Sequence, residues 1–151
     1  MDRIDRKILA ELQNDGRLSV TELADRVGLS LSPCHRRLRA MEDAGVIQGY
    51  RAHLAPEALG LNFTALVFVT MREGTSQAVN EFEAAVQKIP HVIEAQRLFG
   101  DPDYLLHVIT RDLPAFQQLY DQELSALPNV QRLTSTLVMK RVVTDRVLPL
   151  S

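Results

Sequence analysis

Residues 19–49 read SVTELADRVGLSLSPCHRRLRAMEDAGVIQG and carry the strongest structural signal in the chain. They contain two short helical patterns separated by a turn at Gly28. In the first pattern, Ser19 and Glu22 have the spacing of a capping box, in which each side chain satisfies a backbone N–H at the helix start. Gly28 ends this pattern because glycine tolerates the left-handed conformation that a helix stop often requires. The arrangement predicts a helix-turn-helix.

The second helical pattern has one apolar side. At about 100° per residue, that side is formed by Cys34, Leu38 and Met41. Because Cys34 lies on this stripe, we interpret it as a small buried hydrophobic residue and not as a nucleophile. Ser30 or Ser32 can cap the helix, and Pro33 falls in its first turn, where a missing N–H costs little.

The other side of this helix is polar and basic, which suits the major groove of DNA. N-terminal residues of a recognition helix reach deepest, so we assign Ser32, His35 and Arg36 to base edges. Arg37 and Arg39 are assigned to phosphates. The predicted DNA-binding residues are Ser30, Ser32, Pro33, His35, Arg36, Arg37 and Arg39. The alternative is a solvated basic face paired with Glu42 and Asp43; the cap, turn and spacing together favour DNA.

Residues 2–14 supply a third helix, with apolar residues at helical spacing and charges between them. Three helices with a shared apolar face predict a winged-type helix-turn-helix domain over residues 1–50. Residues 51–61 then read as an extended hinge. A domain of different periodicity follows over residues 62–151.

Composition restricts the class of protein. The chain has 151 residues, one cysteine and a formal net charge of −2. One cysteine allows no internal disulfide, which suits a reducing cytoplasm, and the charged N-terminus lacks the apolar core of a signal peptide. No apolar run approaches membrane-spanning length. We therefore expect a cytoplasmic protein without a membrane partner, whose DNA affinity comes from local clustering of basic residues.

The C-terminal domain shows alternating strand and helix signals. Strands are expected over 63–71, 91–99, 104–110 and 130–143, and helices over 75–89 and 112–127. The order βαββαβ is that of the ferredoxin-like sandwich, so the fold class is α+β. Two helices cover one face of such a sheet, and the other face carries apolar residues such as Leu66 and Phe68. An exposed apolar face usually marks a partner, here a second copy of the chain.

Two stretches of the chain together resemble a known family. Residues 2–50 resemble the N-terminal half of the Lrp/AsnC (leucine-responsive, or feast/famine) regulators. The segment GDPDYLLHV, which begins at Gly100, resembles the Gly-Asp-x-Asp-Tyr signature of their C-terminal domain, with Pro102 in the variable slot. The resemblance implies binding to double-stranded DNA by a homodimer, often assembled as an octamer of four dimers. It also implies an amino-acid effector bound near contacts between dimers.

The signature turn has a chemistry that suits such an effector. Its glycine can offer backbone N–H groups to a carboxylate, and Asp101 or Asp103 can oppose an ammonium. Hydroxyls of residues 134–136 can complete the pocket from a neighbouring subunit, and Tyr104 can touch the ligand or pack at an interface. The predicted effector-binding residues are Gly100, Asp101, Asp103, Tyr104, Thr134, Ser135 and Thr136. The alternative is a tight hairpin turn with Asx-type hydrogen bonds.

Other classes of function fit less well. His91 and His107 do not form a metal-ligand spacing with Asp101 and Asp103, and no nucleophile motif or phosphate-binding loop is present. We therefore expect no catalytic residues, no metal and no cofactor apart from the amino-acid effector. The favoured function is a sequence-specific DNA-binding transcriptional regulator modulated by an amino acid or related molecule. The remaining alternative is an architectural DNA-organising protein without an effector response.

Overall fold

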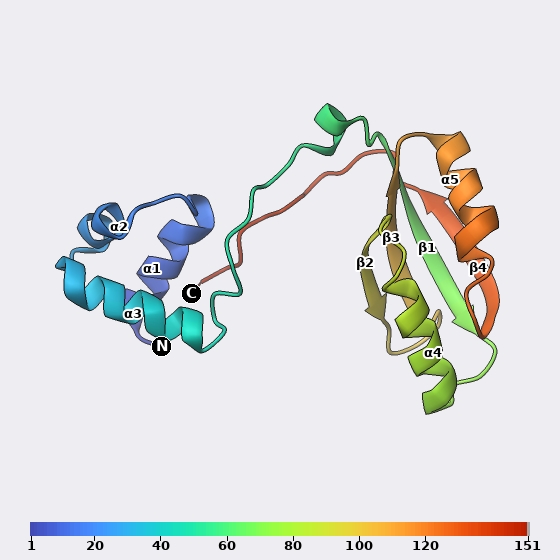
Figure 1. Cartoon of the computed structure of the whole chain (residues 1–151), viewed down its shortest axis with the longest axis horizontal. Coiled ribbons are helices and arrows are strands. Elements are labelled where there is room, and N and C mark those ends of the chain that lie inside the picture. The colour runs from blue at the N-terminus through green and yellow to red at the C-terminus, as the bar shows by residue number, and fades with distance from the viewer. Residues whose placement is uncertain (151) are drawn as a thin grey trace. The chain divides into compact units, whose positions relative to one another are not determined.

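The computed structural model of the chain describes residues 1–150; Ser151, which the predicted C-terminal domain includes, lies outside the described residues. The chain divides into two compact units (Figure 1). The first unit contains Met1–His53 and the terminal segment that begins at Val143, and the second contains Leu54–Val142. The predicted C-terminal domain, residues 62–151, includes this terminal segment.

Three helices form the first unit: α1 (Arg3–Asn14), α2 (Val20–Val27) and α3 (Leu31–Asp43). The predicted capping box of α2 is confirmed, with the Glu22 N–H donating to Ser19 Oγ at 3.1 Å and the Ser19 N–H donating to Glu22 Oε2 at 2.9 Å. Gly28 adopts the left-handed conformation, with φ of 74°. The buried core is formed by Ile8, Leu23, Ala24, Val27, Cys34, Leu38 and Met41. The described residues of this unit contain no strand.

The terminal segment is attached to α1 by a reciprocal pair of hydrogen bonds. The Leu148 N–H donates to Gln13 Oε1 at 2.7 Å, and Gln13 Nε2 donates to the Leu148 carbonyl at 3.1 Å. A second attachment joins His53 Nε2 to Asp145 Oδ2 at 3.0 Å. The Gln13 side-chain amide thus bonds to both the N–H and the carbonyl of Leu148, as a residue of a neighbouring β-strand would.

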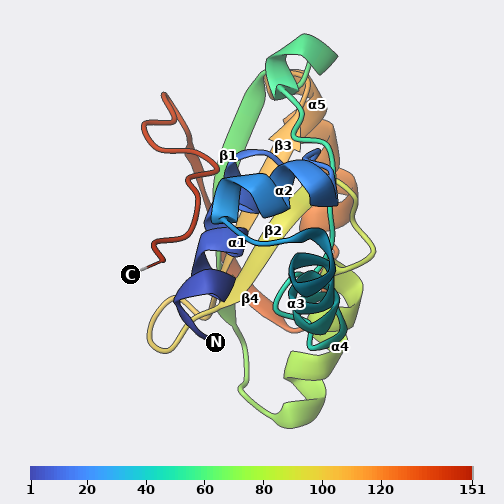
Figure 2. The ribbon, with the colours of Figure 1, turned by 90° about the vertical axis from the view of Figure 1, so that its left-hand side faces the viewer.

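The second unit is an antiparallel sheet with helices on one side, as Figure 2 shows for α4 and α5. Its elements are η1 (Pro56–Leu59), β1 (Phe63–Met71), α4 (Ser76–Val86), β2 (Val92–Arg97), β3 (Tyr104–Thr110), α5 (Leu113–Leu119), η2 (Tyr120–Leu124) and β4 (Val130–Leu137). The strand order β2-β3-β1-β4 confirms the predicted ferredoxin-like arrangement. Alternate residues of β1, including Val67 and Val69, are buried against the helices.

Two expected boundaries in this unit are wrong. The last strand ends at Leu137 and not at Val143, because β4 pairs with β1, which begins at Phe63. The Thr64 carbonyl accepts the Val138 N–H at 3.0 Å. The helix expected over 112–127 is divided into α5 and a π-helical turn, η2. Within the described residues, no helix combines the length and apolar character needed to cross a membrane.

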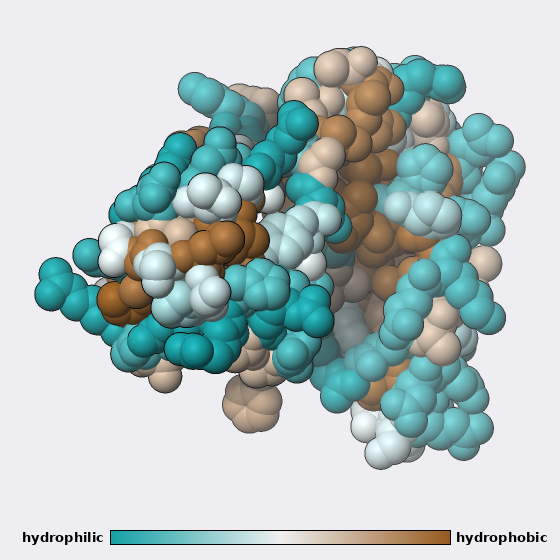
Figure 3. Space-filling view, turned by 60° about the vertical axis from the view of Figure 1, so that its left-hand side comes forward, coloured by the Kyte–Doolittle hydropathy of each residue, from teal (hydrophilic) through white to brown (hydrophobic). Residues whose placement is uncertain are grey.

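The side of the sheet away from α4 and α5 is uncovered in the single chain. The residues that strand register places on this open face include Leu66, Phe68, Leu105, His107, Thr134 and Thr136. Leu66 and Phe68 at its centre are only half-buried. In the space-filling view of Figure 3, apolar side chains also gather in a band on the surface of this unit. A sheet with apolar residues on both faces needs a covering partner on the second face.

Candidate functional site

Helix α3 presents to solvent the polar face that was predicted to contact DNA. Ser32, His35, Arg36 and Arg39 are exposed, whereas Cys34, Leu38 and Met41 face the core. Ser30 is the N-cap of α3, although its side chain makes no capping hydrogen bond. Among the described residues, no ion pair engages Arg36 or Arg39, so the alternative of a face neutralised by Glu42 and Asp43 is not observed. Their guanidinium groups are therefore available to an anionic partner.

Arg37 has a different environment from its two neighbouring arginines. Its Nη1 atom lies 2.7 Å from Asp2 Oδ2 and 2.9 Å from Asp5 Oδ1. These hydrogen bonds raise the pKa of Arg37, and the pKa of Asp2 is lowered, first by the backbone N–H of Asp5 and then by Arg37. Since Asp2 is the N-cap of α1, Arg37 joins the start of α1 to the middle of α3. This side chain is committed within the unit, which weighs against its assignment to a phosphate.

The signature turn is built around the side chain of Asp103. Asp103 Oδ2 accepts the Met71 N–H at 2.7 Å, and the Asp103 N–H donates to the Val69 carbonyl at 2.9 Å. Asp103 therefore joins the end of β1 to the start of β3. The side-chain bond spans 32 positions, so it is not the local Asx-type bond of the hairpin alternative. Gly100 has a φ of 140°, a conformation that favours glycine, and an added Cβ there would meet nothing within 4 Å. A side chain at Gly100 would thus act through backbone strain and not by crowding.

Tyr104 points into the core and not toward solvent. It is 3% exposed, its ring lies 4.5 Å from that of Phe82, and its hydroxyl donates to Glu83 Oε1 at 2.7 Å. Arg97 Nε donates to the same oxygen at 2.7 Å. The pKa of Glu83 is lowered, first by Tyr104 and then by Arg97, and burial raises the pKa of Tyr104 to about 12.

The raised pKa of Tyr104 predicts a late phase in alkaline titration. The folded-state pKa lies above the unfolded value of about 10, so the stabilisation from the neutral phenol is present below pH 10 and is lost as pH rises toward 12. Ultraviolet absorbance should resolve a late phase in which Tyr104 ionises near the pH of unfolding. Tyr104→Phe should abolish that late phase, and Tyr120→Phe should retain it. A late phase that persists in Tyr104→Phe would contradict the assignment.

A cavity of about 380 Å³ lies beside the signature turn. Its walls are formed by Met71, Arg72, Glu73, Gly74, Val79, Arg97, Leu98, Asp103 and Tyr104. Two of the predicted effector residues, Asp103 and Tyr104, line it, whereas Gly100 and Asp101 do not. The residues predicted from the sequence did not include Arg72, Glu73 and Arg97, which also line the cavity. Arg72 and Glu73 directly follow β1, whose last residue, Met71, bonds to Asp103 of the turn. Their position just after a predicted strand could have indicated that they lie near this site. The cavity has both positive and negative groups in its walls.

The three hydroxyl residues of β4 do not converge in one chain. Thr134 lies opposite Phe68 and Thr136 opposite Leu66 on the open face, whereas Ser135 lies opposite Val67 on the face of the helices. None of the three lines the cavity beside Asp103. Thr134 and Thr136 can meet a ligand only through a molecule that covers the open face.

Both units match families of known proteins. Residues 1–48 match the family described as "Winged helix-turn-helix DNA-binding", and residues 64–148 match "Lrp/AsnC ligand binding domain". The proline dehydrogenase transcriptional activator of Rhodobacter capsulatus is 43% identical over 143 residues, which cover 95% of this chain and 93% of that protein. The leucine-responsive regulatory protein of Salmonella typhimurium is 43% identical over 142 residues, which cover 94% and 87%.

Solved structures agree over nearly the whole chain. A Neisseria meningitidis transcriptional regulator in complex with L-Met superposes with a TM-score of 0.93 at 40% identity, covering 99% of this chain and 97% of that chain. An AsnC family transcriptional regulator from Agrobacterium tumefaciens gives a TM-score of 0.94 at 36% identity, with the same coverage of 99% and 97%. The two family matches follow one another along the chain in the order of its two units. This chain therefore belongs to the Lrp/AsnC family of DNA-binding transcriptional regulators.

Proposed function

We propose that this regulator reads its operator with α3, placing Arg36, His35 and Ser32 at base edges and Arg39 at a phosphate. The observation that carries the proposal is that Arg36 and Arg39 are exposed and have no ion-pair partner within residues 1–150, in contrast to the ion-paired Arg37. An arginine can donate two hydrogen bonds to guanine in the major groove. Arg37 then supports binding indirectly, by holding α3 against α1.

The functional form is a homodimer formed through the open face of the sheet. Leu66 and Phe68 at the centre of that face are the apolar residues that a second copy would cover. A dimer with two α3 helices suits an operator whose half-sites lie about one helical turn apart, or a multiple of it. Further assembly of four dimers into an octamer is the form that the family resemblance implies.

The effector is an amino acid bound in the cavity beside Asp103. A zwitterion needs a cationic partner for its carboxylate and an anionic partner for its ammonium. Arg72 supplies the first and Glu73, with Asp103, the second, and all three line the same cavity. Arg97 is less available because it is paired with Glu83. The related Neisseria regulator was solved with L-Met, which supports an amino acid of this size as a ligand here.

Calorimetric titration of L-methionine and L-leucine into the protein, with and without operator DNA, tests this proposal. We expect the effector to change operator affinity by about 5- to 150-fold, and operator DNA to change effector affinity by the same factor, because coupling between two binding sites is reciprocal. Asp103→Asn keeps an acceptor for the Met71 N–H but removes the charge. It should weaken effector binding and leave operator affinity without effector unchanged.

Two outcomes would count against this assignment. If Asp103→Asn and Arg72→Gln both bind the effector as the wild type does, the site lies elsewhere. If none of the standard amino acids binds or alters operator affinity, the architectural alternative gains support. Loss of DNA binding in Asp103→Asn without effector would instead mean that the turn is structural only.

A further inference from the structure

Glu83 of α4 connects that helix to the hairpin that carries the signature turn. Its Oε1 atom accepts hydrogen bonds from the Tyr104 hydroxyl and from Arg97 Nε, both at 2.7 Å. Arg97, at the end of β2, and Tyr104, at the start of β3, are paired across the two strands. Strand pairing therefore places both donors beside each other, and one carboxylate oxygen of the helix holds the base of the turn.

The side chain of Arg97 lines two cavities. One is the cavity of about 380 Å³ beside Asp103, and the other has a volume of about 240 Å³ and is lined mainly by residues of α4 and β2. Arg97 and Tyr104 belong to the walls of both cavities, whereas Glu83 belongs only to the wall of the smaller one. The ion pair with Glu83 therefore draws the Arg97 charge toward the smaller cavity and away from the site proposed for the effector.

The charged groups around the cavity beside Asp103 have a surplus of negative charge. Its wall contains two arginines, Arg72 and Arg97, and two carboxylates, Glu73 and Asp103. Glu83 adds a third carboxylate, which is bonded to Arg97. Because that pair neutralises Arg97, the charge of Arg72 remains against the two carboxylates of the wall.

We propose that Glu83 is a specificity-determining residue, which excludes amino acids with an acidic side chain from the cavity beside Asp103. The inference rests on the effector site proposed above, in which the carboxylate and ammonium groups are held near the end of β1, so that the effector side chain faces Val79, Leu98 and Arg97. While Glu83 holds Arg97, a carboxylate in the effector side chain meets no available cation and is repelled by the surplus negative charge. Repulsion of unwanted ligands is one of the two ways in which binding sites discriminate.

L-Glutamate and L-glutamine test this role, because they have nearly the same shape and differ in the charge of the side chain. Calorimetric titration should show that the wild type binds glutamate more weakly than glutamine. In Glu83→Gln, glutamate should bind about tenfold more tightly than in the wild type, because the released Arg97 donates a charge-assisted hydrogen bond to it, and glutamine affinity should change little. The double variant Glu83→Gln/Arg97→Gln should lose this gain.

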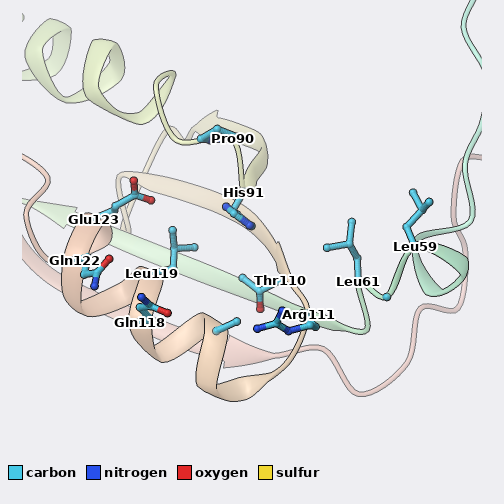
Figure 4. Close-up of a pocket in the computed structure, with 12 residues that line it drawn as sticks. Leu59, Leu61, Pro90, His91, Thr110, Arg111, Gln118, Leu119, Gln122 and Glu123 are labelled. Carbon is cyan, nitrogen blue, oxygen red and sulfur yellow. The ribbon is translucent and has the colours of Figure 1, made fainter.

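Glu123 provides the control for removal of a negative charge. Figure 4 shows Glu123 in the wall of a different cavity, of about 600 Å³. Thr110 in that wall pairs with Phe63, whereas Tyr104 pairs with Val69, and the six positions between Tyr104 and Thr110 correspond to roughly 20 Å of strand. Glu123→Gln removes the same charge far from Arg97 and should leave glutamate affinity unchanged.

The ionisation of Tyr104 reports on the bond to Glu83 without any ligand. Burial is the largest cause of the raised pKa of Tyr104, Glu83 is the next, and Arg97 acts in the opposite direction. The late phase of alkaline titration should therefore move to lower pH in Glu83→Gln. Arg97→Gln is a second variant, which retains the bond between Tyr104 and Glu83. It leaves the Glu83 charge without a partner, so glutamate should bind even more weakly than to the wild type.

The inference on Glu83 is overturned if glutamate binds Glu83→Gln no more tightly than it binds the wild type, or if Glu123→Gln produces the same gain. In either case methionine binding that depends on Asp103 would still support the proposed effector site. If no amino acid binds the wild type or any variant, the proposed effector site fails and the inference fails with it.

Discussion

Arg36→Ala is expected to lower affinity for the operator by about 1–3 kcal/mol while affecting binding to random DNA much less. The reason is that Arg36 is exposed on α3, lies in the N-terminal half of the helix and has no ion-pair partner among the described residues. A bidentate contact with guanine is lost only where that guanine is present. The measurement is a comparison of Kd for the operator and for random DNA over a range of salt concentrations.

The neighbouring arginines provide matched controls for Arg36→Ala. Arg39→Ala should weaken both kinds of DNA alike and reduce the slope of log K against log salt by about 1, as expected for one phosphate contact. Arg37→Ala should instead lower the thermal stability of the protein, because Asp2 and Asp5 lose their partner. If Arg36→Ala leaves the ratio of operator to random affinity unchanged, the orientation of α3 on DNA differs from the one proposed.

Phe68→Glu is expected to dissociate the proposed homodimer and to lower operator affinity by at least about a hundredfold. Phe68 lies at the centre of the open face, between Leu105 and Thr134 on the neighbouring strands. A carboxylate buried there without a partner carries a large desolvation penalty. Once the subunits separate, the two reading helices no longer bind as one molecule, and the gain from simultaneous attachment, about 10²–10⁴, is lost.

Sedimentation equilibrium and binding to operators with one or two half-sites provide the measurements for Phe68→Glu. Affinity for a single half-site should remain close to that of the wild type, because α3 is unaltered. Ser135→Glu adds the same charge one residue from Thr134, on the opposite face of the sheet, and should remain dimeric. A wild-type protein that is monomeric at micromolar concentration yet binds its operator fully would rule out this mode of assembly.

Local patterns were sufficient to predict most elements of the fold. The capping box at Ser19 and the left-handed Gly28 act within a few residues, so they could be recognised without the rest of the chain. The strand Phe63–Met71 was also predicted correctly, since its alternation reflects burial against helices. The end of β4 could not be predicted, because it depends on where the partner strand β1 begins.

The residues of the candidate sites also divide into those that local sequence predicts and those that depend on distant parts of the chain. The exposed face of α3 follows from helical periodicity alone, so Ser32, His35, Arg36 and Arg39 were placed correctly on it. The ion pair of Arg37 involves Asp2, 35 positions away, and no local pattern indicates it. The charged residues beside Asp103 likewise come from different strands: Arg72 follows β1, and Arg97 ends β2. Strand pairing in the folded sheet brings them together, so Arg72 and Arg97 could not be predicted from local sequence.

The hydrogen bonds between Gln13 and Leu148 have a mechanical consequence. Because the terminal segment returns to the three-helix unit, the polypeptide passes between the two units twice and not once. A domain attached by one flexible linker can rotate freely about it, whereas a domain attached by two linkers is restrained in rotation. Two chain segments therefore connect the three-helix unit to the second unit, and both must twist if either unit rotates.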